Sequence, residues 1–267
     1  MKGVGLIMVI TFLGVWMVPE DGDTVSFVIE LETGEKILVD SGINTVKGLY
    51  NAGIDPCSIT HLIITHSHGD HIAGLPMYLF YRYKYAPLVK KIPPSFLRII
   101  TTQDAWTSVR AYVDIPYPNL LDNPHINVSH INSGDSIQIA SNHILQTFIS
   151  DHNPITFGFK LIDTKSKKNV VYSADTAICE TVFTAAEDTD CLIHDVVANS
   201  MYPMFRKAGH SLCKDVGEQS EKMHVKKLVP VHRLPIYKRD YKDYEDELRS
   251  AFKGEIFIPL DGDVLIV

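Results

Sequence analysis

Cysteine is scarce in this chain, and its spacing excludes several classes of protein. The 267 residues include four cysteines, and no two of them form a Cys-x-x-Cys pair. A disulfide framework or a zinc knuckle would need cysteines at regular spacing. We therefore expect reduced, mostly buried thiols in a cytoplasmic protein. The four are Cys57, Cys179, Cys191 and Cys213.

The chain also lacks an excess of positive charge, a long hydrophobic segment and any low-complexity tract. Its net charge is −7, so no overall cationic field favours nucleic acid. The apolar segment 3–18 is too short for a membrane span, and no small-residue cleavage site follows it. We expect a buried strand over residues 8–13 in preference to a secretion signal, and no membrane partner. Glycine-rich phosphate loops and serine-triad motifs are absent from the sequence.

What the chain does contain is a series of short apolar runs separated by turns. Alternation predicts a hairpin from residues 24–30 and 36–40, and helical spacing predicts a helix over 239–252. A second helix is expected over 211–224, with Ser211 as its N-terminal cap. Residues 256–258 and 264–267 predict a terminal hairpin. Other expected elements are a helix over 46–52 and strands at 61–65, 136–139, 144–149, 157–162, 169–173, 192–193 and 227–231. Because no linker divides the chain, we expect one α/β domain over residues 1–267.

The most informative motif is the run His66-Ser67-His68-Gly69-Asp70-His71, which follows the strand at 61–65. Histidine and aspartate are poor core residues and need partners when they are buried. A turn at Gly69 would direct His66 and His68 to one point, and Asp70 and His71 to a neighbouring point. Imidazole nitrogens and carboxylate oxygens are ligands for zinc, and they also suit manganese or iron. The run therefore predicts a metal site.

This run resembles the signature of the metallo-β-lactamase fold superfamily, and further segments resemble the rest of that pattern in the same order. They are Asp40-Ser41-Gly42, Asp151-His152, Tyr172-Ser173-Ala174-Asp175-Thr176, Val229-Pro230-Val231-His232 and Asp261-Gly262. The resemblance extends over nearly the whole chain. It implies the fold of the family, an αββα sandwich of two mixed β-sheets flanked by helices.

The resemblance also implies a site for two divalent metal ions, with zinc expected first and manganese or iron as alternatives. One ion would be bound by His66, His68 and His152. The second would be bound by Asp70, His71 and His232, and Asp175 would bridge both ions. Two cations about 3.5–4 Å apart need a bridging anion, and they turn a shared water into a hydroxide that attacks carbonyl carbon or phosphorus. We expect Asp70 to take part in catalysis as well as in metal binding.

Two more segments resemble the ribonuclease Z-like phosphodiesterase branch of the superfamily. They are Leu192-Ile193-His194-Asp195 and Ala208-Gly209-His210-Ser211. In that branch the first segment usually carries glutamate where this chain has Asp195. The resemblance implies that His210 protonates the leaving alkoxide or stabilises charge on the phosphorane, while Asp195 orients the imidazole. General acids of this kind typically accelerate a reaction by about 10²–10⁴-fold.

The spacing of the motifs also bears on the size of the substrate. Only 22 residues separate His152 from Asp175, which leaves no room for the long arm with which many ribonuclease Z enzymes clamp tRNA. Together with the acidic charge, this favours a small-molecule substrate over tRNA. The tyrosine-rich stretch 78–85 leaves three interpretations open, namely base stacking, a homodimer interface and ordinary core packing.

The leading hypothesis is a metal-dependent hydrolase of a small phosphodiester such as a cyclic nucleotide. One alternative is a lactone or thioester hydrolase that uses the same metal site. Another is a non-catalytic or biosynthetic metal-binding protein.

Overall fold

The structure, a computed structural model, describes residues 8–20, 22–238 and 241–267, and these form two compact units. Of the described residues, the first unit contains 8–14, 23–131 and 260–266. The second unit contains 15–20, 22, 132–238, 241–259 and Val267. The expectation of one domain over the whole chain stays a prediction.

The sheet of the first unit is mixed, with strand order β14-β1-β2-β3-β4-β5-β6. Pairing is antiparallel from β14 to β3 and parallel from β3 to β6. The predicted hairpin of β2 and β3 is confirmed by the register of Phe27 opposite Val39. The strands are β1 (Met8–Gly14), β2 (Ser26–Leu31), β3 (Lys36–Val39), β4 (His61–Ile63), β5 (Leu97–Thr101), β6 (Ile126–His130) and β14 (Val264–Ile266).

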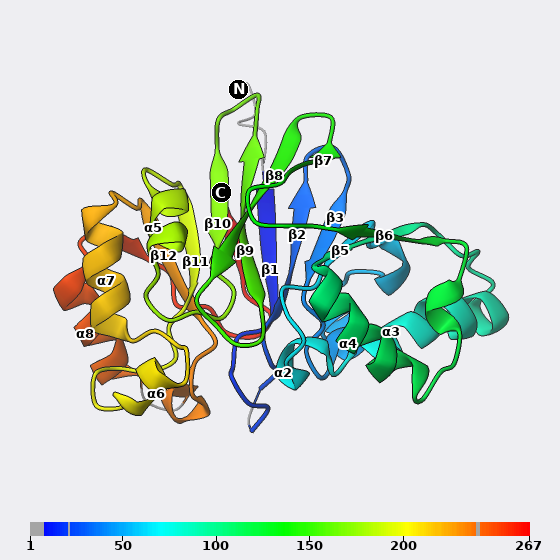
Figure 1. Ribbon diagram of the computed structural model, residues 1–267, viewed down its shortest axis with the longest axis horizontal. Helices are drawn as coiled ribbons and strands as arrows, with labels where there is room; N and C mark the ends of the chain where they lie inside the picture. The colour runs from blue at the N-terminus through cyan, green and yellow to red at the C-terminus, as the bar shows by residue number, and fades with distance from the viewer. Residues whose placement is uncertain (1–7, 21, 239–240) are drawn as a thin grey trace. The chain divides into compact units, whose positions relative to one another are not determined.

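Helices pack on this sheet and close a hydrophobic core. Buried Leu62 and Ile99 of the strands share one cluster with Leu75, Tyr78 and Val109 of the helices. Figure 1 shows α3 and α4 close together beside the strands of this unit. The helical elements are α1 (Thr45–Asn51), η1 (Pro56–Ser58), α2 (Gly69–Ile72), α3 (Leu75–Phe80), the π-helix η2 (Tyr81–Lys90), α4 (Gln103–Asp114) and η3 (Leu120–Asp122).

The second unit also has a mixed sheet, in the order β13-β12-β11-β10-β9-β8-β7. Pairing is parallel from β13 to β10 and antiparallel from β10 to β7. Its strands are β7 (Ser136–Ala140), β8 (His143–Ser150), β9 (Thr156–Asp163), β10 (Asn169–Tyr172), β11 (Cys191–Asp195), β12 (Lys227–Val231) and β13 (Glu255–Ile256). Its helical elements are α5 (Glu180–Ala186), α6 (Met204–Lys207), α7 (Cys213–Lys222), η4 (Pro235–Lys238) and α8 (Lys242–Ala251).

The two seven-stranded mixed sheets with their helices confirm the predicted α/β class. The predicted terminal hairpin is wrong, because β13 pairs with β12 in one sheet and β14 pairs with β1 in the other. The predicted cap is also wrong. Helix α7 begins at Cys213, and the hydroxyl of Ser211 instead donates to the carbonyl oxygen of Thr176 at 2.8 Å.

The tyrosine-rich stretch belongs mainly to the core of the first unit. Tyr78, Tyr81 and Tyr83 are buried, while Tyr85 is 40% exposed. Ordinary core packing therefore accounts for three of these side chains. No helix in the described part of the chain combines the length and the apolarity that a membrane crossing requires.

The parallel strands explain where polar side chains collect. Asp40 follows β3 and His66 follows β4 in the first unit. In the second unit Asp175 follows β10, Asp195 ends β11 and His232 follows β12. The carboxyl ends of parallel strands meet at one edge of a sheet, where α/β proteins bind their ligands. Each unit therefore gathers its metal-ligand residue types at such an edge.

Candidate active-site residues

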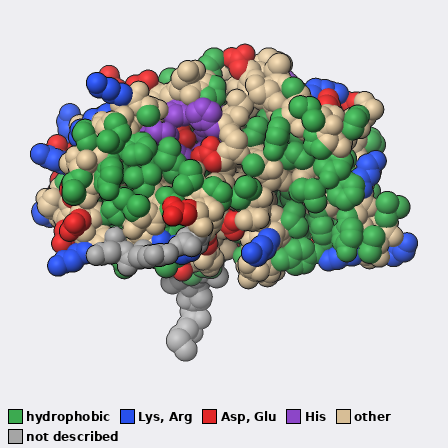
Figure 2. Space-filling model, turned by 90° about the horizontal axis from the view of Figure 1, so that it is seen from below, with side chains coloured by type: hydrophobic (Ala, Val, Ile, Leu, Met, Phe, Trp, Pro, Cys, Tyr) green, Lys and Arg blue, Asp and Glu red, His purple; other side chains and the backbone are tan. Residues whose placement is uncertain are grey.

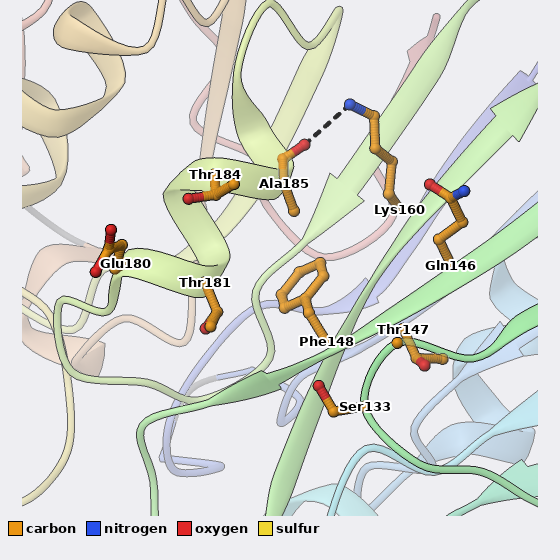
Figure 3. Close-up of a pocket in the computed structure, with 10 residues that line it drawn as sticks. Ser133, Gln146, Thr147, Phe148, Lys160, Glu180, Thr181, Thr184 and Ala185 are labelled. Atoms are coloured by element: carbon orange, nitrogen blue, oxygen red, sulfur yellow. Dashed lines mark hydrogen bonds between the residues drawn. The ribbon is translucent and has the colours of Figure 1, made fainter.

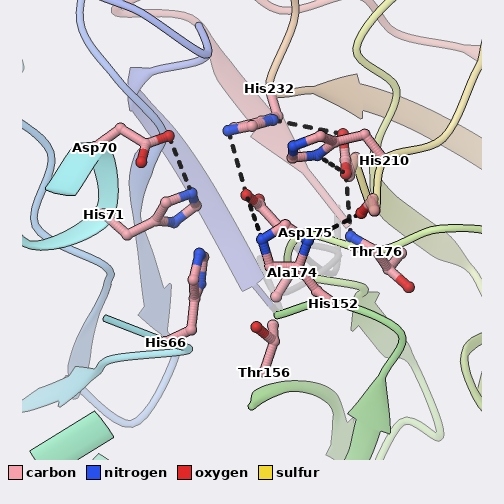
Figure 4. A network of polar contacts seen from close by, with 12 residues as sticks. His66, Asp70, His71, His152, Thr156, Ala174, Asp175, Thr176, His210 and His232 are labelled. Carbon is pink, nitrogen blue, oxygen red and sulfur yellow. Dashed lines mark hydrogen bonds and ion pairs between the residues drawn. The ribbon is translucent and has the colours of Figure 1, made fainter. Parts of the chain in front are cut away.

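In the first unit, the histidine run leaves β4 in an extended conformation and then turns into α2 at Gly69. The rings of His66 and His71 are fully buried, with centroids 4.2 Å apart, and the centroids of His66 and His68 are 4.9 Å apart. The Nε2 atom of His71 lies 3.5 Å from Oδ2 of Asp70 (Figure 4). The four donors of the run therefore lie close to one another, while the predicted division into two neighbouring points stays a prediction.

The side chain of Asp40 contacts this run and holds it in place. Its Oδ2 lies 2.9 Å from Nδ1 of His71, and its Oδ1 accepts a hydrogen bond from the backbone N–H of Thr65 at 2.8 Å. The carboxyl is completely buried. Burial raises the pKa of Asp40, against the charge and hydrogen bonds of His71 and Thr65. Because Asp40 holds Nδ1 of His71, it orients the opposite nitrogen, Nε2, for a ligand.

In the second unit, Asp175 lies between two of the predicted metal-binding histidines. Its Oδ2 is 3.4 Å from Nε2 of His232 and 3.9 Å from Nε2 of His152 (Figure 4). All three side chains are at most 2% exposed. One carboxylate oxygen facing two imidazole nitrogens at these distances is the arrangement expected of a carboxylate that bridges two cations.

The second ring nitrogen of His66, His152 and His232 lies near an oxygen atom of the protein. Nδ1 of His152 lies 2.9 Å from the carbonyl oxygen of Gly209, and Nδ1 of His66 lies 3.0 Å from the hydroxyl of Thr65. Nδ1 of His232 lies 3.5 Å from Oδ1 of Asp195. Histidines that bind metals are commonly fixed in this way, with Nδ1 anchored and Nε2 directed at the ion. The donors within each unit therefore fit divalent metal ions in both residue type and orientation.

The backbone beside these donors adopts conformations that non-glycine residues rarely take. Ala174, which precedes Asp175, has φ of 52°, and His232 has φ of 62°. Such conformations cost of order 1–3 kcal/mol each and concentrate at functional sites. Gly209 has φ of 84°, and a Cβ there would lie 2.8 Å from Nδ1 of His152. Glycine at 209 is therefore required by the contact with His152.

His210 and Asp195 form the pair that the sequence predicts. Nδ1 of His210 lies 2.8 Å from Oδ2 of Asp195, which also accepts a hydrogen bond from the backbone N–H of Thr176 at 3.0 Å. Burial opposes protonation of His210, but the charge and hydrogen bond of Asp195 outweigh it and raise the pKa of the imidazole. For Asp195, burial is outweighed by His210 and His232, which lower the pKa of its carboxyl. The pair therefore favours a protonated imidazole beside an ionised carboxylate.

The predicted residues thus fall into two sets. His66, His68, Asp70 and His71 lie together in the first unit, and His152, Asp175, Asp195, His210 and His232 lie together in the second. That both sets complete one dinuclear site stays a prediction. Histidine side chains gather beside acidic ones at the surface seen in Figure 2. His194 is buried and its ring stacks on Phe183 with centroids 5.3 Å apart, which indicates a structural role.

Three supporting residues were not predicted from the sequence, namely Thr65, Gly209 and Thr176. Thr65 adjoins the predicted His66, so its position in the motif was a signal that could have identified it. The role of Gly209 depends on a contact with distant His152, which no local pattern shows. For Thr176 the functional group is a backbone N–H, which no residue type reveals.

A separate cavity of about 620 Å³ lies in the second unit between β8, β9 and α5 (Figure 3). The ammonium of Lys160 donates to the carbonyl oxygen of Ala185 at 2.9 Å, and the ring of Phe148 forms part of the wall. None of the predicted site residues lines this cavity. This cavity is therefore distinct from the histidine cluster.

Residues 8–247 match the protein family described as "Anti-Pycsar protein Apyc1". The chain is also 25% identical to ribonuclease Z of Halorubrum lacusprofundi, over 97% of this chain and 96% of that protein.

Two solved structures share the fold. The metallo-β-lactamase fold protein YhfI from Bacillus subtilis matches with a TM-score of 0.80 and 18% identity, over 97% of this chain and 99% of YhfI. Yeast PDE1 matches with a TM-score of 0.79 and 15% identity, over 98% of this chain and all (100%) of PDE1. These similarities confirm the metallo-β-lactamase fold and the resemblance to its ribonuclease Z-like branch.

Proposed function

The chain belongs to the family of the anti-Pycsar protein Apyc1, and from this membership and its site residues we propose that it hydrolyses a small phosphodiester such as a cyclic nucleotide. The observation that carries the proposal is the contact between His210 and Asp195, at 2.8 Å. Attack on a phosphodiester with an alkoxide leaving group needs a proton donor, whereas activated carbonyl substrates do not. A histidine held protonated beside the metal-ligand residues of its unit supplies that donor.

The proposed cofactor is a pair of divalent metal ions. His66, His68 and His152 would bind one ion, Asp70, His71 and His232 the other, and Asp175 would bridge them. Zinc is proposed first because imidazole and carboxylate are its ordinary ligands, and manganese or iron would also suit them. When bound, the ions would supply an activated water and offset the charge of the phosphodiester.

The protein's own residues would position the proton donor and the metal-binding rings. Asp195 holds Nδ1 of His210, so that Nε2 carries the proton that passes to the leaving oxygen. Asp40 and Gly209 fix the rings of His71 and His152. Because these contacts exist before substrate arrives, little reorganisation is needed during the reaction.

A small substrate is favoured by the segment between His152 and Asp175. Strands β9 and β10 occupy most of it and pair directly with each other. No inserted arm lies in this segment, all of which the structure describes. With the net charge of −7, this supports a small substrate over tRNA, although the relatives include ribonuclease Z.

The test is a substrate screen of the purified protein with its metal content measured alongside. Substrates would include cyclic nucleotides, an aryl phosphodiester, lactones and thioesters. We expect turnover of the phosphodiesters with about two metal ions per chain, and its loss in Asp175→Asn, which keeps the shape of the side chain but removes its charge. Turnover of lactones or thioesters with none of the phosphodiesters would refute the proposal.

A further inference from the structure

A pocket of about 380 Å³ lies next to His210, entirely within the second unit. Its volume is within the range of about 300–1,000 Å³ that is typical of small-molecule sites. Ala177 and Ile178, which closely follow Asp175 in the chain, contribute apolar side chains to its lining. Arg206 and residues of α7 contribute polar side chains. The lining residues are Ala177, Ile178, Arg206, His210, Asp215, Glu218 and Gln219.

One wall of this pocket is fixed by an ion pair. Nε and Nη2 of Arg206 donate to the two oxygens of Asp215, at 2.7 and 3.1 Å. A two-point contact of this kind holds both side chains in one geometry. Two of the five N–H groups of the guanidinium are used, and each oxygen of Asp215 keeps acceptor capacity. The pair therefore forms a rigid wall that can still donate and accept hydrogen bonds.

Other polar groups around the pocket have hydrogen-bonding capacity to spare. His210 is 5% exposed, and while its Nδ1 contacts Asp195, its Nε2 has no hydrogen-bond partner among the described residues. The side-chain amide of Gln219 likewise makes no hydrogen bond to any residue that the structure describes. Glu218 has only a long contact of 3.8 Å with Lys214, and both side chains are more than half exposed. A buried nitrogen and a free amide facing one hollow indicate a ligand with complementary groups.

The charges of the lining indicate which part of a substrate enters. Asp215 offsets the charge of Arg206, and Asp195 offsets that of protonated His210, so the exposed carboxylate of Glu218 is the charge that is least compensated. Its negative charge disfavours a phosphate group in this pocket. A phosphodiester would therefore leave its phosphate at the metal-ligand residues and place a neutral group here. That group should combine apolar surface with polar atoms at its edge, because the lining joins apolar Ala177 and Ile178 with side chains that donate and accept hydrogen bonds. A heterocyclic base has this chemistry.

Resting on the proposed function, we propose that this pocket binds the nucleoside on the leaving-oxygen side of the phosphodiester. His210 protonates the oxygen that joins this nucleoside to phosphorus, and the base lies against α7. The amide of Gln219 donates to and accepts from the edge of the base. Glu218 accepts from an amino group, so that bases with an exocyclic amine are preferred.

The experiment compares two nucleosides that differ at one position, adenosine with an amino group and inosine with an oxo group. Binding of each is measured by calorimetry for the wild type, Glu218→Gln, Gln219→Ala and the control Lys222→Ala. Lys222 is exposed on the same helix and does not line the pocket. The ratio of kcat/KM for cyclic AMP to that for bis(4-nitrophenyl) phosphate, which has no base, is measured alongside.

We expect the wild type and Lys222→Ala to bind adenosine about 5–10-fold more tightly than inosine, as one solvent-exposed hydrogen bond allows. Glu218→Gln should reduce this preference to less than about 2-fold. Gln219→Ala should weaken the binding of both nucleosides about 3–10-fold, and it should also lower the kcat/KM ratio. The proposal is overturned if all four proteins bind both nucleosides equally, or if none of them binds either nucleoside. If nucleoside binding responds to the variants but no phosphodiester is cleaved, the pocket stands and the proposed function fails.

Discussion

At the scale of single residues, the contact between His210 and Asp195 leads to a prediction about leaving groups. A proton donor matters most when the leaving group is a poor one. We expect His210→Ala to lower kcat by about 10²–10⁴-fold for a phosphodiester with an alkoxide leaving group. For one with a 4-nitrophenolate leaving group the loss should stay below about tenfold. Steady-state kinetics on both substrates checks this, and an equal loss on both would show that His210 acts only in folding or metal binding.

Other single residues show which parts of the candidate site could be predicted from the sequence and which could not. His66, His68, Asp70 and His71 were readable because four donor residues occur within six positions. The role of Gly209 was not, because it depends on a carbonyl oxygen and a φ of 84° that bring the backbone against His152, 57 residues earlier in the chain. Ser211 has a residue type that suits a helix cap, but tertiary contact with Thr176 takes its hydroxyl instead.

At the scale of elements, apolar runs revealed most of the strands but not their partners. Residues 255–256 and 264–266 lie around a turn, as in a hairpin, yet each joins a different sheet. Pairing is decided by long-range packing of the two faces, which a local pattern does not encode. The segment 86–135 is harder to read from the sequence because its prolines interrupt the apolar pattern, and β5, α4 and β6 lie there.

Hydrogen bonds to Asp190 connect three neighbouring strands of the second sheet, and their contribution to stability can be tested by varying the pH. Asp190, just before β11, accepts from Nζ of Lys226 at 2.9 Å and of Lys168 at 3.2 Å, and from the backbone N–H of Asn169 at 3.0 Å. Burial alone would raise the pKa of Asp190, but these hydrogen bonds lower it. Since the lysines are exposed, we expect Asp190→Asn to lower the free energy of unfolding by only about 1–2 kcal/mol at pH 7.

The pH dependence of that loss has a definite sign. A carboxyl with a lowered folded-state pKa stabilises the protein above its unfolded pKa, and the stabilisation disappears as the pH falls through the folded value. The difference between wild type and Asp190→Asn should be full above about pH 5 and shrink below about pH 4. Urea unfolding at several pH values measures it, with exposed Glu187→Gln as the control. A difference that does not change between pH 7 and pH 3 would exclude an ionic role for Asp190.

At the scale of the whole molecule, the two sets of donors belong to two compact units, and metal removal tests whether they act together. Ions that bind only the folded chain stabilise it by about 4 kcal/mol when their concentration is a thousand times Kd. For a chain of this size, we expect a chelator to lower Tm by on the order of 10 °C. Asp70→Asn removes a donor of the first unit, and Asp175→Asn removes one of the second.

If the ions need both units, both variants should lose metal and most of the chelator-dependent shift, whereas Glu187→Gln should keep them. Calorimetry with and without chelator, and metal analysis of each variant, give the answer. A shift that survives in Asp70→Asn but not in Asp175→Asn would place the metal within the second unit alone. In that case the histidine run that dominates the sequence would have a role other than binding the ions that stabilise the fold.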